Sequence, residues 1–408
     1  KKPALRFKGF TDPWEQRKLG ELVEIGDIDH RMPETVADGI PYLMTGDFVG
    51  TNELNFDGTK MISEEDYCQL SQKIKPEKGD ILFARYASVG AARYVDFTRK
   101  FLISYSCAII KKSKKINSKY LYHFITSGKV QQQIKLEINT GSQANIGIDS
   151  MKNHIVVSMP PLEEQTKIAD ALSNLDHLIT LHQRKYEKLV NIKKSMLDKM
   201  FPKNGASVPE IRFKGFTDLW EQRKLEEYLE VSGQKNFEGI YTKEDVSSVS
   251  GDFGIVNQIE FQGRSFAGAS VANYGVVETG DIVYTKSPLK SNPYGIIKAN
   301  KGKNGIVSTL YAVYKPKQSA NPEFVQNYFE QDARMNNYMH PLVNKGAKND
   351  MKVSAENALK GQIVFPDIKE QRTISEFFRN LDTLITLHQR KLEKLQNIKK
   401  SCLEKMFV

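Results

Sequence analysis

Leu178-Ile-Thr-Leu-His-Gln-Arg-Lys185 occurs a second time in this chain, letter for letter, as Leu384-Ile-Thr-Leu-His-Gln-Arg-Lys391. A neighbouring stretch behaves in the same way, because Asn191-Ile-Lys-Lys-Ser195 returns as Asn397-Ile-Lys-Lys-Ser401. Both pairs are 206 residues apart, the difference between positions 384 and 178. Repetition at a fixed period marks a duplicated structural unit. The chain is therefore expected to contain two copies of one design.

Each copy lies in a segment that should form one long helix. Residues 162–201 contain neither Gly nor Pro and are bracketed by Pro161 and Pro202, so nothing inside them should break a helix. Their apolar residues recur at steps of three and four, the heptad spacing of a coiled coil, and residues 368–407 repeat the pattern. We expect the two helices to pack antiparallel along a seam formed by Leu175, Ile179, His182, Leu189, Leu381, Ile385, His388 and Leu395. The two seam histidines are predicted to set its register.

A second repeated element opens each half of the chain. Arg6-Phe-Lys-Gly-Phe-Thr-Asp12 returns as Arg212-Phe-Lys-Gly-Phe-Thr-Asp218, and Trp14-Glu-Gln-Arg-Lys-Leu19 returns as Trp220-Glu-Gln-Arg-Lys-Leu225. The separation is again 206 residues, so the whole chain is a tandem duplication. We interpret this element as an anchor that docks each half against the long helices.

The segments between anchor and helix share a skeleton while their letters diverge. Gly79-Asp-Ile-Leu-Phe83 parallels Gly280-Asp-Ile-Val-Tyr284, a turn followed by a β-rich run. An amphipathic stretch that suits a helix begins at Asn117 and at Asn321. Residues 20–160 and 226–366 are therefore predicted to form two mixed α+β globules with one fold.

Composition restricts the class of protein. The 408 residues are 40% hydrophobic, which is enough for two or three domains with real cores, and the formal charge of +10 favours an acidic partner. Three widely spaced cysteines argue against a disulfide framework and against a zinc site. No apolar run approaches the roughly 18 residues of a spanning helix, and no signal-peptide core follows the basic start. We expect a cytoplasmic protein.

Basic, aromatic and amide residues gather in loops at matching places of the two globules. Arginine and lysine side chains reach base edges and phosphates, amides pair with adenine, and small neighbours let a backbone approach DNA closely. We expect these loops to be exposed. The predicted DNA-binding residues of the first half are Arg85, Tyr86, Ser88, Arg93, Tyr94, Ser142, Gln143 and Asn145. Those of the second half are Lys286, Ser287, Lys290, Tyr294, Lys345 and Lys348.

Catalytic motifs are not found in the sequence. It contains no Walker A motif, no Gly-rich dinucleotide loop, no HExxH and no GxSxG elbow. The Asn-Pro-Pro-aromatic tetrad with which amino-methyltransferases hold a flipped base is also not found, since Asn292-Pro-Tyr294 lacks one proline. We expect a chain that has no catalytic residue and binds no cofactor or metal.

Two diverged globules, each followed by a nearly identical long helix, resemble the DNA specificity subunit of type I restriction-modification systems. The motifs that carry the resemblance are Gly79-Asp-Ile-Leu-Phe-Ala-Arg85, the loop at Gly141-Ser-Gln, and Pro160-Pro-Leu-Glu-Glu-Gln165, echoed by Pro366-Asp-Ile-Lys-Glu-Gln371. The likeness covers essentially the whole chain. The second half departs from the first at Lys286-Ser-Pro, where the first has Arg85-Tyr-Ala.

The resemblance implies an α+β fold with two similar target recognition domains separated by two long antiparallel helices that form a coiled coil, with pseudo-twofold symmetry. The expected domains are residues 1–160 and 204–366 for target recognition, with 161–203 and 367–408 as helical spacers. The family reads a bipartite site on double-stranded DNA and binds two methyltransferase subunits, through which restriction subunits join. S-adenosylmethionine, ATP and Mg are then expected on those partner subunits.

Two other classes of function remain open at this level. A coiled-coil adaptor without DNA readout would explain the repeated helices but not the paired divergence of the globules. A stand-alone DNA-modifying enzyme would need a catalytic site that the sequence does not contain.

Overall fold

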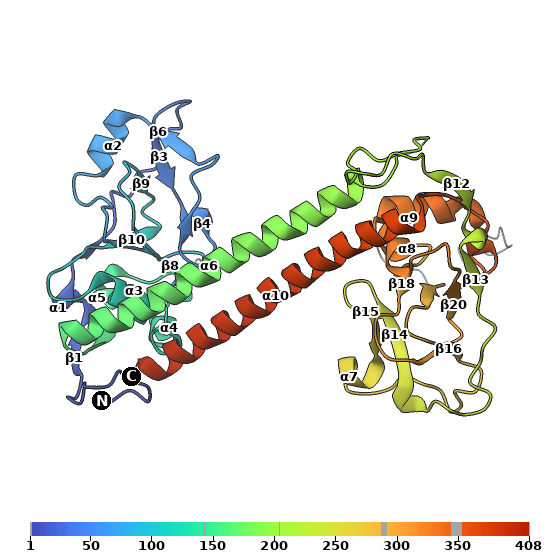
Figure 1. The fold of residues 1–408 in the computed structure, drawn as a ribbon. Coiled ribbons are helices and arrows are strands. Elements are labelled where there is room, and N and C mark those ends of the chain that lie inside the picture. The colour runs from blue at the N-terminus through green and yellow to red at the C-terminus, as the bar shows by residue number, and fades with distance from the viewer. Residues whose placement is uncertain (1, 142–143, 204, 287–291, 344–352, 408) are drawn as a thin grey trace. The chain divides into compact units, whose positions relative to one another are not determined.

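The computed structural model describes residues 2–141, 144–203, 205–286, 292–343 and 353–407. The chain divides into two compact units, Lys1–Arg184 with His388–Val408, and Lys185–Leu387. Figure 1 shows that each unit combines one β-rich globule with parts of both long helices, α6 (Leu162–Lys199) and α10 (Ile368–Met406). The predicted α+β fold class, with two such globules and two packed helices, is confirmed.

The first unit contains two main sheets. Four strands pair in the order β2-β10-β7-β8, and three pair in the order β6-β3-β9, while β1-β11 and β4-β5 form small ribbons. The strands are β1 (Glu15–Lys18), β2 (Ile25–Gly26), β3 (Ile40–Leu43), β4 (Phe48–Val49), β5 (Glu53–Leu54), β6 (Lys60–Ile62), β7 (Ile81–Ala84), β8 (Ala92–Tyr94), β9 (Leu102–Ile103), β10 (Cys107–Ile110) and β11 (Val156–Met159). The helices before α6 are α1 (Leu19–Leu22), α2 (Glu64–Leu70), α3 (Ser118–Ile125), α4 (Gly128–Leu136) and α5 (Ile148–His154), with a 3-10 turn η1 (Thr45–Asp47).

The second unit repeats this plan with one sheet enlarged. Its sheets run β13-β20-β17-β18 and β15-β14-β19-β16, beside the ribbon β12-β21. The strands are β12 (Glu221–Lys224), β13 (Leu229–Val231), β14 (Val246–Ser250), β15 (Gly254–Asn257), β16 (Gly275–Val277), β17 (Ile282–Thr285), β18 (Ile297–Ala299), β19 (Gly305–Val307), β20 (Tyr311–Pro316) and β21 (Gln362–Phe365). The helices are α7 (Gln258–Gln262), α8 (Pro322–Tyr328) and α9 (Asp332–Met339), with 3-10 turns η2 (Leu225–Glu227), η3 (Lys243–Asp245), η4 (His340–Leu342) and η5 (Asn357–Leu359).

The Gly-Asp motifs mark the same turn in both units. Gly79 and Gly280 have φ angles of 99° and 94°, a left-handed conformation that glycine adopts without strain. The following aspartate, Asp80 or Asp281, accepts a hydrogen bond from a backbone N–H three residues earlier, at 2.8 Å and 2.7 Å. The turn therefore starts β7 and β17 in the same way.

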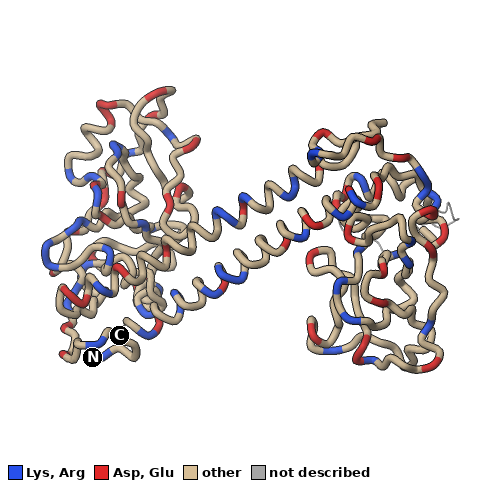
Figure 2. The backbone as a smooth tube through the Cα atoms, in the orientation of Figure 1, with Lys and Arg blue, Asp and Glu red and all other residues tan. Residues whose placement is uncertain are grey.

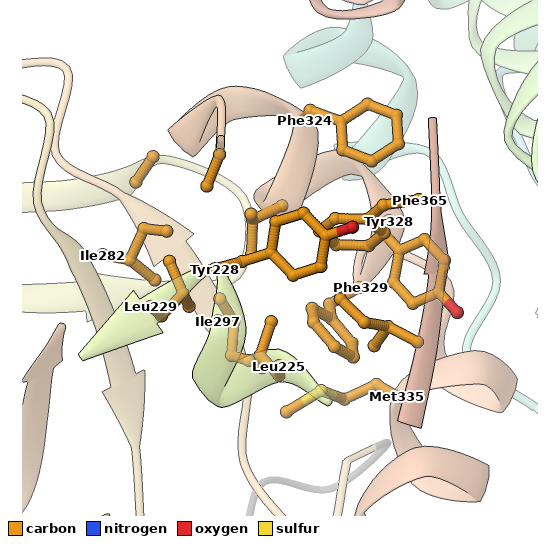
Figure 3. Packing of buried hydrophobic residues seen from close by; sticks show 14 of the residues in the cluster. Leu225, Tyr228, Leu229, Ile282, Ile297, Phe324, Tyr328, Phe329, Met335 and Phe365 are labelled. Atoms are coloured by element: carbon orange, nitrogen blue, oxygen red, sulfur yellow. The ribbon is translucent and has the colours of Figure 1, made fainter. Parts of the chain in front are cut away.

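Aromatic residues from the globule and from a helix end fill each core. In the second unit, Phe324, Tyr328 and Phe365 pack with Leu225 and Tyr228 (Figure 3). Phe201, at the end of the first long helical segment, joins this cluster with its ring centroid 5.5 Å from that of Phe324.

The first core is closed by the far end of the chain. The ring of Phe407 lies 5.5 Å from the rings of Tyr120 and Phe124, and its side chain is 1% exposed. Positions 201 and 407 are 206 residues apart, so the two units use equivalent plugs. Each core therefore contains a phenylalanine that lies just beyond the end of the long helix following the other globule.

The long helices pack antiparallel within each unit. In the first unit Asp176 Oδ1 lies 2.5 Å from Lys399 Nζ, and in the second Asp382 Oδ1 lies 2.7 Å from Lys193 Nζ. From the Asp176–Lys399 pair to the His182–His388 pair, residue numbers rise along α6 and fall along α10, so the two helices run antiparallel. His182 and His388 meet Nδ1 to Nδ1 at 2.8 Å, and the predicted seam residues are all buried or half-buried.

The repeated anchor holds each globule to its helix. Arg6 forms two hydrogen bonds to the buried carboxylate of Glu164, at 2.7 and 2.8 Å, and Trp14 Nε1 donates to the same group at 3.2 Å. Arg212 repeats the paired contact with Glu370 at 2.7 Å for both bonds. The anchoring role predicted for this element is confirmed.

Candidate nucleic-acid interface

Arg85 follows strand β7 and is 6% exposed. Its guanidinium forms an ion pair with the buried carboxylate of Asp27 and donates a hydrogen bond from Nε to Ile146 O at 3.0 Å. Burial would raise the pKa of Asp27, but the hydrogen bond from His30 and the charges of Arg85 and Lys73 outweigh it and lower that pKa. The expectation that Arg85 stands on an exposed loop is wrong, because its guanidinium is buried in an ion pair with Asp27.

Arg93 lies on β8 and is also buried, at 8% exposure. Its guanidinium donates to the backbone carbonyls of Val49, Gly50 and Glu53 at 3.0–3.2 Å. Burial lowers its pKa, because the charged form is stripped of water. The expected exposure of Arg93 is therefore wrong as well, since the side chain holds the β4-β5 ribbon against the sheet.

The other described candidates of the first half remain closer to solvent. Ser88 is exposed and Tyr86 half-buried, and Ala87 between them has a φ of 59°, which is unusual for a residue other than glycine. Tyr86 forms a β-bridge with Asn145, so these two predicted residues lie together. Tyr94 is half-buried, and its backbone N–H donates to Asn52 Oδ1 at 2.6 Å. Two further candidates lie outside the described residues: Ser142 and Gln143.

In the second half, Lys286 and Tyr294 flank the loop between β17 and β18, and both are half-buried. Burial lowers the pKa of Lys286, and the nearby charge of Lys235 adds to the effect. The backbone N–H of Lys286 donates to Leu310 O at 3.1 Å, and the carbonyl of Tyr294 accepts a bond from Tyr284 Oη at 2.6 Å. Four candidates lie outside the described residues: Ser287, Lys290, Lys345 and Lys348.

Most of the described candidates belong to equivalent hairpins of the two units. Strand β8 pairs with β7 so that Arg93 stands opposite Leu82, and β18 pairs with β17 so that Lys298 stands opposite Val283. The loops β7-β8 and β17-β18 are thus equivalent. The first, with strand β8, carries Arg85, Tyr86, Ser88, Arg93 and Tyr94, and the second carries Lys286 and Tyr294.

The same pairing identifies a residue that sequence reasoning missed. Lys298 is the counterpart of Arg93 and is 8% exposed, and burial lowers the pKa of its ammonium group. Inside the globules the separation between equivalent residues is no longer 206, so a fixed offset does not find it. Only the strand register reveals the correspondence.

Within the described ranges, no cluster of three or more His, Cys, Asp or Glu side chains is suited to hold a metal ion. The same described part of the chain contains no helix long and apolar enough to span a membrane.

A family model for the "Type I restriction modification DNA specificity domain" matches residues 11–191. The matched residues are similar to that domain, so the chain resembles a type I restriction-modification specificity subunit. The chain is 24% identical to the "Putative type I restriction enzyme MjaX specificity subunit" of Methanocaldococcus jannaschii, over 96% of this chain and 92% of that protein. It is 23% identical to the "Type I restriction enzyme EcoKI specificity subunit" of Escherichia coli, over 86% of this chain and 79% of that protein.

The solved structure of a type I restriction-modification S subunit from M. genitalium has a similar fold, with a TM-score of 0.62 at 16% identity. The match covers 100% of this chain and 99% of that one. The resemblance seen in the motifs is confirmed. The specificity subunit is the non-catalytic component that reads the DNA target within a type I restriction-modification complex.

Proposed function

We propose that this specificity subunit reads a bipartite site on double-stranded DNA, with one globule for each half-site. The observation that carries the proposal is that the two units share several structural elements but differ in one of their two main sheets. Both units keep the Gly-Asp turn, the anchor and the equivalent four-stranded sheet, whereas the first has the β6-β3-β9 sheet and the second the larger β15-β14-β19-β16 sheet. Divergence that includes those sheets and the adjoining loops suits two readers with different targets.

The β7-β8 and β17-β18 loops are the reading elements in this proposal. Exposed Ser88 and half-buried Tyr86 can offer hydroxyls to bases or phosphates, and Lys286 with Tyr294 offers a cation and an aromatic ring. Arg85 and Arg93 then act by holding the loop and the β4-β5 ribbon, while the remaining sequence candidates stay proposed contacts.

The helices are proposed to dock two methyltransferase subunits, through which the restriction subunits join the complex. In the first unit Leu178 and Leu181 of α6 are 40% and 39% exposed, and in the second Leu384 and Leu387 of α10 are 43% and 47% exposed. The two pairs are 206 residues apart, so each unit presents the same apolar pair. Lysine and arginine recur along both helices as well (Figure 2). S-adenosylmethionine, ATP and Mg would be bound by the partners.

Exchange of one globule tests the proposal. Residues 20–160 are replaced by the corresponding segment of a family member, while residues 226–366 are kept. We expect a changed half-site on one side and an unchanged half-site on the other, because each globule has its own core. Mapping of methylated adenines in a host that carries the hybrid with its partners gives the answer.

The reciprocal exchange of residues 226–366 is the matched control and should alter the other half-site. A change of both half-sites in either hybrid would contradict one reader per globule. Methylation that does not depend on either globule would favour an adaptor without DNA readout.

A further inference from the structure

Lys193 of the second unit is held by two carboxylates. Its Nζ lies 2.6 Å from Glu330 Oε1 and 2.7 Å from Asp382 Oδ1, and its side chain is 16% exposed. Burial would lower the pKa of Lys193, but the two carboxylates outweigh it and raise that pKa. In the second unit, the charge of Lys193 is therefore balanced by the carboxylates of Glu330 and Asp382.

The equivalent cation of the first unit has one carboxylate fewer. Lys399, 206 residues after Lys193, pairs with Asp176 at 2.5 Å, and its side chain is 12% exposed. Among the described residues, no second carboxylate lies within ion-pair distance of Lys399. The place of Glu330 is taken by Thr126.

Helix capping establishes that Thr126 and Glu330 are equivalent. The backbone N–H groups of the N-cap residues Asn117 and Asn321 each donate to the side-chain oxygen of a glutamine on the long helix, at 2.9 Å. Counting from these caps, 126 and 330 both lie nine residues on. Each also directly precedes the N-cap residue of the next helix, α4 or α9.

The space left by the shorter side chain is a real hollow. A cavity of about 330 Å³ is lined by Thr51, Thr126, Gly128, Lys399 and Lys400, together with the exposed carboxylate of Glu404 and the apolar side chains of Ile179 and Leu403. A neighbouring hollow of about 530 Å³ shares four of these residues, Thr51, Thr126, Lys399 and Leu403. Both lie entirely within the first unit.

The helix that follows Thr126 or Glu330 also begins with one acidic residue fewer in the first unit. Helix α9 begins with Asp332, an acid that suits the positive end of a helix, whereas α4 begins with Gly128 and has no acidic residue in its first turn. Position 126 thus lacks the carboxylate that pairs with the lysine in the second unit, and position 128 lacks the acid that begins α9. The charge of Lys399 also acts on His123, where burial and the charges of Lys399 and Lys119 together lower the pKa of the ring.

We propose that the first unit binds an oxyanion of the phosphate type between Lys399 and the start of α4, in the place that the Glu330 carboxylate fills in the second unit. Anions of this type are commonly bound by the N–H groups at the start of a helix and by ammonium groups, which donate charge-assisted hydrogen bonds to them. This site concerns Lys399 and its surroundings, and it does not depend on which DNA sequence the globules read. The phosphate group can belong to free inorganic phosphate or to a DNA backbone.

Reciprocal substitutions in the full chain test the site. Thr126→Glu adds to the first unit the carboxylate that the second unit has at Glu330. Glu330→Thr removes that carboxylate from the second unit. The thermal midpoint is followed while inorganic phosphate replaces chloride at constant ionic strength. A ligand that binds only the folded state raises the midpoint in proportion to the logarithm of its excess over Kd.

We expect phosphate to raise the midpoint of the unmodified chain. The Thr126→Glu chain should lose this response, and the Glu330→Thr chain should gain a second one. Thr98→Glu, at an exposed residue of the first globule, introduces the same charge elsewhere and should keep the response. A Thr126→Glu chain that responds to phosphate as the unmodified chain does would overturn the site.

DNA titration then distinguishes the two sources of phosphate. If the anion is a DNA phosphate, Thr126→Glu should weaken binding to all sequences alike and reduce the salt slope by about one. If it is free phosphate, DNA affinity should stay unchanged while the thermal response is lost. Because the thermal readout contains no DNA, a failure of DNA reading would leave it intact.

Discussion

His123 is an ionisable side chain enclosed within the first unit, 1% exposed. Its Nε2 lies 3.2 Å from Ser173 Oγ, and burial, helped by the charges of Lys399 and Lys119, lowers the pKa of the ring to about 3. An unfolded histidine titrates near 6.5, so at intermediate pH the unfolded chain binds a proton that the folded chain refuses. This contribution to stability is present in full above about pH 6.5 and falls as the pH drops toward 3.

The counterpart of His123 in the second unit is Asn327, which is also buried and does not titrate. We expect His123→Asn to flatten the acid dependence of stability between about pH 6.5 and 3, where the histidine contributes up to about 1.4 kcal/mol per pH unit. Urea unfolding at a series of pH values measures this slope. An unchanged slope would show that His123 is protonated in the folded state.

Substitutions at Arg85 and Ser88 distinguish a residue that supports the β7-β8 loop from one that contacts DNA. Removing Arg85 takes the buried member of the ion pair away from Asp27, which keeps only the more exposed His30 and Lys73, and breaking a buried ion pair typically costs about 3–5 kcal/mol. Arg85→Ala should therefore lower stability by an amount of this order. Ser88→Ala, at an exposed residue of the same loop, should leave stability unchanged and weaken DNA binding.

Denaturant unfolding and DNA titration of both variants give the comparison. A stable Arg85→Ala chain that loses discrimination at one base would instead make Arg85 a direct reader.

At the scale of the elements, the anchors join each globule to its long helix through one buried carboxylate. Glu164 and Glu370 are both 0% exposed and are each bound by an arginine through two short bonds. Paired charge-assisted bonds of this kind combine strength with fixed geometry. The anchor therefore sets how α6 and α10 leave their own globules.

We expect Glu164→Gln to destabilise the first unit by a few kcal/mol, because it leaves Arg6, with a side chain only 12% exposed, without a countercharge. Glu370→Gln should act equally on the second unit. The exposed neighbour Glu163 provides the control, since Glu163→Gln should change stability by no more than about 0.5 kcal/mol. Hydrogen exchange of the core amides measures each unit separately, and equal protection in all three variants would contradict an anchoring role.

At the scale of the whole molecule, the two halves are closed by the same contacts. Leu5 N donates to Lys405 O at 2.9 Å within the first unit, and Ile211 N donates to Lys199 O at 2.9 Å within the second. These pairs are related by the 206-residue period, so the covalent connection from Lys199 to Ile211 corresponds to the hydrogen-bonded contact between Lys405 and Leu5.

The chain should therefore tolerate circular permutation. Opening it within residues 203–209 and joining residue 408 to residue 1 by a short Gly-Ser linker preserves each anchor and each aromatic plug. We expect helix content to be kept and the thermal midpoint to move by only a few degrees, about 1 kcal/mol. Circular dichroism melting measures both quantities.

Opening the chain after Lys185, inside α6, is the matched control and should abolish cooperative unfolding. An equally unstable chain opened within residues 203–209 would show that the covalent connection there is needed.

Much of this architecture could be predicted from local pattern alone. The heptad steps predicted α6 and α10, the period of 206 residues predicted the duplication, and the Gly-Asp turns predicted the starts of β7 and β17. These signals succeed because helix periodicity, turn chemistry and duplication are properties of residues close in the chain or repeated along it. The family resemblance followed from the order of the same parts.

Tertiary structure alone decided which charges are available. Arg85 looked like a free loop cation, but its partner Asp27 lies 58 residues earlier and meets it only across the folded sheet. Lys298 became the counterpart of Arg93 through strand register, and Phe407 closes the first core rather than the one that precedes it in the chain. Sequence determined the repeated elements because their causes are local. Burial and ion pairing depend on contacts between distant segments, which exist only once the chain has folded.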